Sequence, residues 1–410
     1  MPSKKIITHI KGLLNVEHEV KLTGRPETVA MKQIEDAWLA IENGIIVDFG
    51  SMSEWPGISD WTQLEVIDAT GKYVLPAWCD SHTHIVYAGN RVSEFVDRIH
   101  GLSYAEIAAK GGGILNSARQ LQKADASELF ESAMMRLQKC VEYGTGAIEI
   151  KSGYGLNLES ELKMLHVIRR IKEEAPIPVK ATFLCAHALP EEFKGNPDGF
   201  VNHVIAQQIP LVAAEGLADF VDVFCETGYF SAAHTDMILA SAERHGIRAK
   251  IHVNQFTHIG GVRIGTSRNA ISVDHLEILS EEDIAALRDS QTMPVALPGC
   301  SLFLGIPYTP ARELLDAGIP VALATDFNPG SAPSGNMNLV NSLACMKMKM
   351  TPDEVIMAST LHGACAMDVQ NLVGSIAVGK RAHLILTKPL HHYSEMMYSF
   401  GDSPVERVFI

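Results

Sequence analysis

The 410-residue chain lacks the features that mark several classes of protein. Its seven cysteines include no Cys-x-x-Cys pair, which argues against a thiolate metal cluster. Because they are odd in number and scattered, they favour a reducing compartment over a disulfide framework. No apolar run is long enough to span a membrane, and the first residues do not resemble a signal peptide. We therefore expect a cytoplasmic protein without a membrane partner.

Basic residues are fewer than acidic residues. Against 48 acidic residues there are 34 lysines and arginines, which gives a formal net charge of −14 and disfavours nonspecific binding to nucleic acid. The chain is instead rich in apolar sequence, since 47% of its residues are hydrophobic and 20% are charged. A chain of this length and composition can bury a large core, in one large domain and a smaller one.

The most informative motif is Asp80-Ser-His-Thr-His84, which follows the apolar run 73–79. In an extended backbone, residues two positions apart point to the same side, so His82 and His84 can both reach one metal ion. Taken alone the motif is weak, because 17 histidines will produce chance pairs. A surface or packed pair explains it equally well at this point.

Further ligand candidates lie at similar positions downstream. His252, His275 and Asp326 each end a short run of apolar or β-branched residues, and each is followed by a polar or glycine-rich turn. Three neutral imidazoles and one carboxylate suit a divalent ion such as zinc or iron and leave one coordination position open for water. The repeated pattern therefore predicts a metal site.

From about residue 145 onward, short apolar runs alternate with longer amphipathic segments, such as 159–174. Together with the run before His82, the strands that we predict are 147–151, 179–185, 219–224, 248–252, 271–274, 293–297 and 320–325. Eight strands with intervening helices predict an α/β fold, a (β/α)₈ TIM barrel, in which chemistry takes place at the C-terminal ends of the strands. The candidate ligands all occupy such ends.

Both ends of the chain have a different pattern. Short strands at 38–41 and 45–48 flank the turn Glu42-Asn-Gly44, and the segments 374–380 and 383–386 near the other end are similar in character. We predict a small β-sandwich-like domain formed by residues 1–72 and 370–410. The barrel then comprises residues 73–369.

Longer motifs give a resemblance to a known family. They are Asp80-Ser-His-Thr-His84 with Arg91, Lys110-Gly-Gly-Gly-Ile114, Glu149-Ile-Lys-Ser-Gly-Tyr-Gly155, Ala186-His-Ala-Leu-Pro190, Asp274-His-Leu-Glu277 and Ala324-Thr-Asp-Phe-Asn-Pro-Gly-Ser331. Together they resemble the amidohydrolase superfamily. The Ser-Gly-Tyr-Gly and Asp-Phe-Asn-Pro-Gly strings are much more specific than His-x-His.

The resemblance implies an activity and a set of site residues. The activity is metal-dependent opening of the cyclic amide of 4-imidazolone-5-propanoate by water, which yields N-formimidoyl-L-glutamate in L-histidine degradation. The implied metal ligands are His82, His84, His252 and Asp326. The implied substrate contacts are Arg91, Tyr154, His187, Gln255, Asn328, Gly330 and Ser331. One divalent metal per chain, Zn²⁺ or iron as Fe²⁺ or Fe³⁺, and a homodimer are expected on the same ground.

Two residues are candidates for proton transfer. Asp326 and His275 could take a proton from water and pass it to the departing ring nitrogen. Asp326 could instead act only as a metal ligand, and His275 could be a core histidine bonded to the backbone. We place Gln255 beside them in the catalytic group, as a residue that holds the substrate.

The substrate contacts also have simpler readings. A lone Arg91 is by default a surface residue, although its guanidinium could bind the propanoate carboxylate at two points. The glycines around Tyr154 permit a tight turn, and the string 328–331 is typical of a turn as well. Lys151 resembles the carbamylated lysine of two-metal relatives in residue type only, so we favour one metal.

Two rival functions remain. A deaminase of the same superfamily would share the ligand set but typically needs an acid three residues after the histidine of the fifth strand, and here that position is Gln255. An amide cannot act as a general acid at neutral pH. A non-catalytic scaffold would have lost metal ligands, and none of them is missing here.

Overall fold

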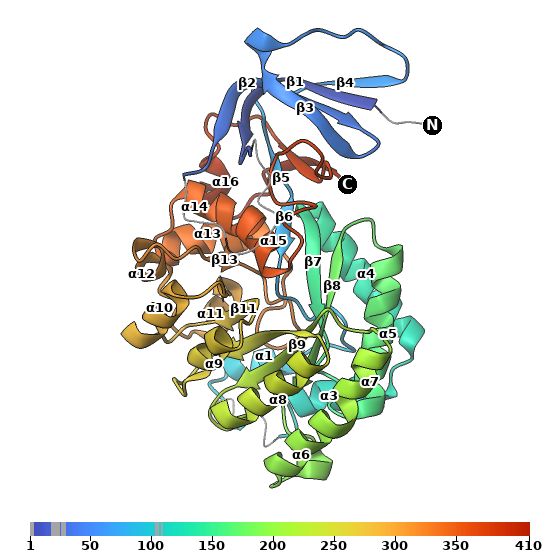
Figure 1. Ribbon diagram of the computed structural model, residues 1–410, viewed down its shortest axis with the longest axis vertical. Coiled ribbons are helices and arrows are strands. Elements are labelled where there is room, and N and C mark those ends of the chain that lie inside the picture. The colour runs from blue at the N-terminus through green and yellow to red at the C-terminus, as the bar shows by residue number, and fades with distance from the viewer. Residues whose placement is uncertain (1–3, 18–24, 26–29, 103–105, 108–109) are drawn as a thin grey trace.

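The molecule contains two separate β-sheets, which lie one above the other in Figure 1. The structure is a computed structural model, and it describes residues 4–17, 25, 30–102, 106–107 and 110–410. The larger sheet has eight strands in the described chain, in the order β13-β12-β11-β10-β9-β8-β7-β6, and all of its pairings are parallel. Its strands are β6 (Trp78–Asp80), β7 (Thr145–Lys151), β8 (Val179–Ala186), β9 (Phe220–Cys225), β10 (Arg248–Val253), β11 (Ser272–His275), β12 (Met293–Ala296) and β13 (Ala322–Leu323).

This sheet is a nearly closed barrel, which confirms the predicted fold class. Its first and last strands meet just beyond their C-terminal ends, where Thr83 and Phe327 form a parallel bridge. There the backbone N–H of Asp326 donates to the carbonyl of His82 over 3.0 Å, and that of His84 donates to the carbonyl of Phe327 over 2.9 Å. The seam of the barrel therefore lies at the predicted metal ligands.

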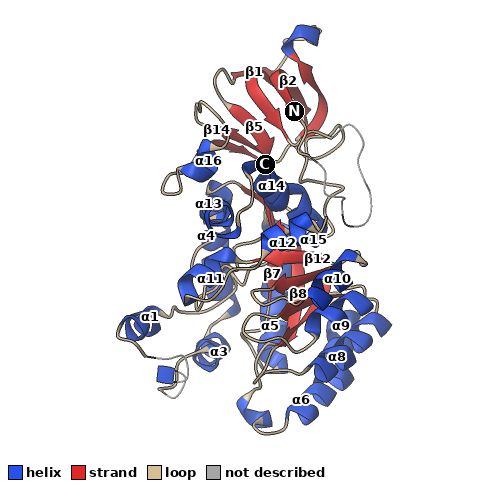
Figure 2. Cartoon of the chain, turned by 90° about the vertical axis from the view of Figure 1, so that its left-hand side faces the viewer, coloured by secondary structure: helices blue, strands red, loops and turns tan. Residues whose placement is uncertain are grey.

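Helices cover the outside of the barrel (Figure 2). The described α-helices are α1 (Val92–Ile99), α3 (Ile114–Lys123), α4 (Ala126–Glu142), α5 (Leu158–Glu174), α6 (Pro197–His203), α7 (Ile209–Ala214), α8 (Ala232–Arg244), α9 (Gly261–Ser267), α10 (Glu281–Arg288), α11 (Pro298–Leu304), α12 (Ala311–Asp316), α13 (Met337–Met348), α14 (Pro352–Met357), α15 (Gly363–Ala366) and α16 (Glu395–Tyr398). Helix α5 shows why they form, because Leu165 and Ile168 lie on its buried face and the side chain of Asn157 caps its N-terminus. Two π-helical turns, Val204–Gln208 and Ala358–His362, join α6 to α7 and α14 to α15. Among the described residues, no helix is both long and apolar enough to cross a membrane.

The second sheet combines the two ends of the chain. Its seven described strands are β1 (Lys4–Leu14), β2 (Gln33–Glu42), β3 (Ile45–Ser51), β4 (Leu64–Asp68), β5 (Tyr73–Pro76), β14 (Leu384–Thr387) and β15 (Val405–Phe409). They form one mixed sheet with a hydrophobic core of its own, to which Ile7, Leu39 and Leu384 contribute. The predicted hairpin turn is present, with Asn43 and Gly44 both at positive φ.

The structure differs from the prediction in the run before His82. We predicted one barrel strand in 73–79, but the run divides into β5, which pairs with β1 and β14, and β6, which begins the barrel. The change of sheet occurs at Ala77, whose N–H donates to the carbonyl of His383. Strand β5 lies just after the expected domain boundary at residue 72 but pairs within the smaller sheet. The division into 1–72 with 370–410 and 73–369 stays a proposal.

Candidate active site

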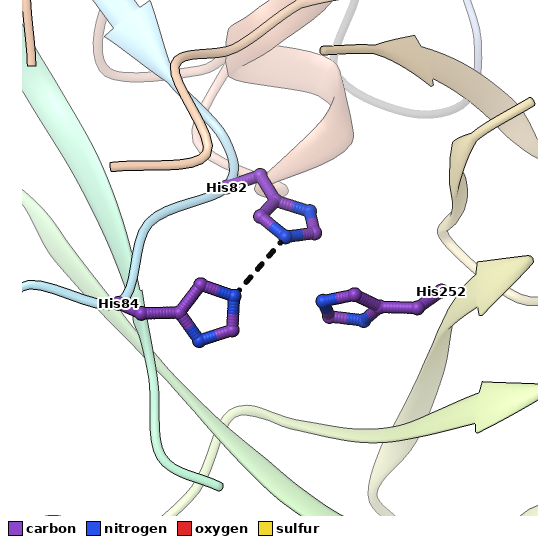
Figure 3. Close-up of side chains that lie close together, drawn as sticks. All are labelled: His82, His84 and His252. Carbon is purple, nitrogen blue, oxygen red and sulfur yellow. Dashed lines mark hydrogen bonds between the residues drawn. The ribbon is translucent and has the colours of Figure 1, made fainter. Parts of the chain in front are cut away.

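Three histidines converge at the C-terminal ends of the barrel strands (Figure 3). His82 and His84 follow β6, and His252 lies on β10. One ring nitrogen from each lies within 4.8 Å of the other two, and the Nε2 atoms of His82 and His84 are 3.3 Å apart. Asp326 completes the group from the end of β13, since its Oδ1 is 3.5 Å from His82 Nε2 and 3.6 Å from His84 Nε2. The four residues predicted as metal ligands are thus brought together.

Carboxylates orient two of these imidazoles from behind. Asp274 Oδ2 lies 2.7 Å from His82 Nδ1, and Asp222 Oδ2 lies 2.9 Å from His252 Nδ1. A carboxylate that accepts from one ring nitrogen of a histidine leaves the other nitrogen available to a metal ion. The Nε2 atoms of His82 and His252 therefore face the shared space.

The residues of this cluster fit a divalent ion. Burial lowers the pKa of His82 and His84 well below that of a free imidazole, which keeps both rings neutral, as metal ligands must be. His252 Nε2 is buried and has no hydrogen-bond partner in the described part of the chain. A buried polar atom without a partner is costly unless a ligand satisfies it. The donor set of imidazoles and one carboxylate suits zinc or iron.

A network of buried charges lies beneath the histidines. Lys151 Nζ is 2.7 Å from Glu149 Oε1, 2.8 Å from Asp222 Oδ2 and 3.4 Å from Asp274 Oδ2. Lys250 contacts Glu149 as well, and all five side chains are fully buried. Burial alone would lower the pKa of Lys151, but the three carboxylates raise it, so the amine is held as an ammonium ion.

His275 and Asp326 occupy strained backbone at the cavity. Their φ angles are +90° and +54°, a region that residues other than glycine rarely adopt and that concentrates at functional sites. His275 Nδ1 lies 3.3 Å from Glu277 Oε1. Burial opposes the charged imidazole, yet the charge and hydrogen bond of Glu277 raise the pKa of His275 above its usual value. Burial also raises the pKa of Asp326.

A cavity of about 730 Å³ opens in front of the histidines. Arg91 lines it from the start of α1, is buried, and donates from Nε to Ser117 Oγ over 2.9 Å. Its Nη2 has no hydrogen-bond partner among the described residues. A Cβ placed on Gly330 would lie 2.2 Å from Arg91 Nη1, so only glycine leaves room for the guanidinium in this position. The structure therefore brings Arg91 and Gly330 together.

Tyr154 and His187 also line the cavity, and Tyr154 lies beside Arg91. His187 Nδ1 donates to the carbonyl of Gly153 over 2.9 Å, which turns its other nitrogen toward the cavity. Burial lowers the pKa of His187 to about 3, so the ring is a neutral hydrogen-bonding group. The Tyr154 ring centroid lies 5.3 Å from that of His187 and 5.9 Å from the guanidinium carbon of Arg91.

The remaining predicted contacts also line the cavity, but their side chains are partly engaged within the protein. Gln255 Nε2 lies 3.3 Å from Cys300 Sγ. Asn328 organises its own loop, because its Oδ1 accepts from the N–H groups of Gly330 and Ser331 at 2.7 and 2.8 Å. Its Nδ2 donates to the carbonyl of Asp326 and to Ser331 Oγ. This geometry is that of a turn, one of the readings that the sequence allowed.

Several residues of the site were given no role in the sequence prediction. They are Ser117, Glu149, Asp222, Lys250 and Asp274, together with Phe224, Tyr229, Phe303 and Ile306 in the cavity lining. A signal for Asp222 and Lys250 exists, because each is a charged residue inside a short apolar strand. Such a charge has to be paired or functional. The apolar lining residues carry no comparable signal.

A parallel barrel with histidines and a carboxylate at the C-terminal ends of its strands defines a metal-dependent hydrolase of the TIM-barrel class. The model of the amidohydrolase family matches residues 73–410. The imidazolonepropionase of Christiangramia forsetii is 55% identical over 407 residues, which cover 99% of this chain and 98% of the relative. That of Geobacillus kaustophilus is 42% identical over 377 residues, which cover 92% and 89%. The chain belongs to the amidohydrolase family and, within it, to the imidazolonepropionases.

Solved structures share the fold at much lower sequence identity. A zinc-bound adenosine deaminase from Xanthomonas campestris has a TM-score of 0.70 and 16% identity, covering 100% of this chain and 92% of the deaminase. The guanine deaminase of E. coli has a TM-score of 0.71 and 15% identity, with coverage of 100% and 98%. At such identities the likeness shows the architecture and says nothing about the substrate.

Proposed function

We propose that the protein hydrolyses the cyclic amide bond of 4-imidazolone-5-propanoate to N-formimidoyl-L-glutamate, a step of L-histidine degradation. Its relatives named imidazolonepropionase match almost the whole chain. The observation that carries the proposal is Arg91, a buried cation at the cavity that forms no ion pair with any described residue. A buried guanidinium with an unpaired N–H group calls for an anion, and the substrate has a carboxylate.

In this proposal, different cavity residues bind different parts of the substrate. The guanidinium of Arg91, held by Ser117 and given room by Gly330, binds the propanoate carboxylate at two points. Tyr154 and His187 offer hydrogen bonds to the carboxylate or to the ring. Gln255 and Ser331, which line the cavity, would hold the heterocycle, and Asn328 fixes the loop that carries Ser331.

His82, His84, His252 and Asp326 would hold the divalent ion. When bound, such an ion activates water as a nucleophile near neutral pH and polarises the carbonyl of the amide. We further propose that the ion is Zn²⁺ or iron, that the protein is a homodimer, and that it is cytoplasmic. The small-molecule substrate follows from the buried, concave site.

Asp326 and His275 would move the protons. Water adds to the ring carbonyl, the carbon–nitrogen bond breaks, and the proton lost by water must reach the departing nitrogen, which stays in the product. Asp326 would accept that proton, and Glu277, 3.3 Å from His275 Nδ1, would help His275 to carry one. Positioned proton transfer of this kind typically contributes about 10²–10⁴-fold to the rate.

Deamination of a purine or pyrimidine ring is the second candidate function, because two deaminases share the fold. It needs a proton donor for the ring nitrogen, and Gln255 cannot serve as one. We therefore expect no ammonia from cytosine, guanine or adenosine, and we expect Gln255→Glu to keep imidazolonepropanoate hydrolysis. Rapid ammonia release by the unmodified protein would overturn both the substrate and the role of Gln255.

The direct test is to mix purified protein with freshly prepared 4-imidazolone-5-propanoate and follow the loss of its ultraviolet absorbance. The product should be N-formimidoyl-L-glutamate. An analogue without the propanoate carboxylate is the matched control, and it should react poorly with the unmodified protein. If the full substrate is not consumed by the metal-loaded protein, the proposal fails.

A further inference from the structure

We propose that Lys151 is a positioning residue for the metal centre, which holds the two carboxylates that orient His82 and His252. This inference rests on the proposed metal ligands and adds a residue that contacts neither metal nor substrate. Lys151 ends strand β7 and is fully buried. Its contribution to the site comes from the contacts of its Nζ.

The contacts of Lys151 reach the same oxygen atoms that face the histidines. Asp222 Oδ2 lies 2.8 Å from Lys151 Nζ and 2.9 Å from His252 Nδ1. Asp274 Oδ2 lies 3.4 Å from Lys151 Nζ and 2.7 Å from His82 Nδ1. One ammonium group therefore links two carboxylate–histidine pairs that come from different strands of the barrel.

The other oxygen of each carboxylate is also held. Asp222 Oδ1 accepts from the backbone N–H groups of Val223 and His252 at 2.7 and 3.1 Å. Asp274 Oδ1 accepts from Ser272 Oγ at 2.5 Å. Because both oxygens of each carboxylate are held, neither carboxylate is free to rotate. Asp274 therefore fixes His82 through a hydrogen bond to Nδ1, and Asp222 lies against Nδ1 of His252.

The charge balance of the network favours a cation above it. Lys151 and Lys250 supply two positive charges against the negative charges of Glu149, Asp222 and Asp274, which leaves an excess of one negative charge beneath the histidines. Without Lys151, the carboxylates of Asp222 and Asp274 would be buried with too little compensation. They would then lose the contact that fixes their position, and the histidines would lose their orientation.

Lys250 provides a matched control within the same network. It is equally buried and contacts Glu149, and its other partners are the carbonyls of Ser81 and Ala366 at 3.0 and 3.2 Å. In the described part of the chain it forms no ion pair with the carboxylates that face the histidines. Removal of Lys250 therefore changes the buried charge equally but leaves both carboxylate–histidine pairs intact.

The test uses two charge-balanced double variants. The Lys151 pair combines Lys151→Met with Glu149→Gln, and the Lys250 pair combines Lys250→Met with Glu149→Gln. Each removes one positive and one negative charge. Zinc affinity is measured by competition with a chromophoric chelator, and cobalt absorption reports the geometry of the bound ion. We expect about 10–100-fold weaker zinc binding and altered cobalt bands for the Lys151 pair, the usual effect of losing a residue that orients a ligand. The Lys250 pair should bind zinc within about threefold of the unmodified protein, on the reasoning that its carboxylate–histidine pairs remain.

Three results would overturn the inference. The first is unchanged zinc affinity in the Lys151 pair, and the second is an equal loss in both pairs, which would assign the effect to packing or total charge. The third is failure of the Lys151 pair to fold, seen by circular dichroism with and without zinc, while the Lys250 pair folds, since Lys151 would then serve the fold. Zinc binding is measured without substrate, so failure of the proposed reaction would leave these results unaffected.

Discussion

An ion pair at the surface of the mixed sheet and the buried charges of the barrel have opposite environments. In the mixed sheet, Lys72 Nζ lies 2.6 Å from Glu406 Oε1 at the surface, with 19% and 39% of the two side chains exposed. In the barrel, Lys151 and its three carboxylate partners are fully buried. Water screens a surface pair, so it contributes little, whereas buried charges must be fully paired. The comparison shows that the buried charges around Lys151 serve the site, whereas the Lys72 pair serves solubility and local order.

Removal of the metal should have the largest effect on turnover, and this effect should be confined to the barrel site. We expect about one zinc or iron ion per chain, and we expect chelation to abolish turnover because the residues at the site cannot activate water by themselves. Elemental analysis and assays before and after chelation measure both quantities. Zinc, manganese or iron should restore activity at least in part. A fully active protein without detectable metal would end the hypothesis.

Loss of the proton-transfer groups comes next. His275→Ala and Asp326→Asn should lower kcat by about 10²–10⁴-fold, the usual contribution of positioned acid–base catalysis. Steady-state kinetics measure this, and metal analysis of each variant separates loss of proton transfer from loss of the ion. Circular dichroism should remain native, because the barrel core lies below the strand ends. A variant that keeps its metal and its full kcat would remove that residue from the mechanism.

Arg91→Ala should act mainly on substrate binding. Truncation of one partner of a buried charge pair typically costs about 2–5 kcal/mol, so KM should rise about thirtyfold or more. Gly330→Ala should change KM in the same direction, because its Cβ would lie where Arg91 Nη1 now lies.

Lys72→Ala is the control for the Arg91 and Gly330 variants, because it removes a cation from the mixed sheet. It should leave kcat and KM unchanged. If KM is insensitive to Arg91→Ala, the guanidinium does not bind the carboxylate. If only Gly330→Ala is silent, the loop can move to accommodate the added methyl group.

The smallest effect concerns stability. His362 is buried in the π-helical turn, donates from Nδ1 to the carbonyl of Val321 over 2.9 Å, and burial lowers its pKa to about 4 from 6.5. The unfolded chain binds the proton more readily, so His362 destabilises the fold as pH falls from 6.5 toward 4. At pH 5 this penalty is about 2 kcal/mol.

Urea unfolding at pH 7 and pH 5 measures this penalty. His362→Gln should reduce the loss of stability between the two pH values by about that amount. Lys72→Ala should change stability by less than about 1 kcal/mol and should not alter its pH dependence. An unchanged pH dependence in His362→Gln would show that this imidazole is not buried in neutral form.

Much of the barrel was predictable because its strands are short, apolar and separated by helices. The predicted strand 179–185 corresponds to Val179–Ala186, and 248–252 corresponds to Arg248–Val253. Once the strands were placed, their C-terminal ends had to share one face of the barrel, which brought His82, His252 and Asp326 together.

The rest depended on contacts between distant segments. The run 73–79 has one continuous apolar pattern, so nothing in it showed that Tyr73–Pro76 pairs with the chain ends. The pairing of Lys151 with Asp222 joins residues 71 positions apart, and strand patterns do not say which charges face each other across a barrel. The closeness of Gly330 to Arg91 likewise depends on how a loop folds back over the cavity.

The closure of the barrel has a consequence for how the protein is made. Asp80 accepts from the N–H and hydroxyl of Thr325, 245 residues away, at the seam where His82, His84 and Asp326 meet. The first two histidines therefore emerge from the ribosome long before the segment that completes their site. During that interval the early strands have unpaired edges, and contacts of such long range form slowly. A metal ion bound by ligands from both sides of the seam would stabilise the closed barrel. Its supply would therefore influence how many new chains reach the closed form.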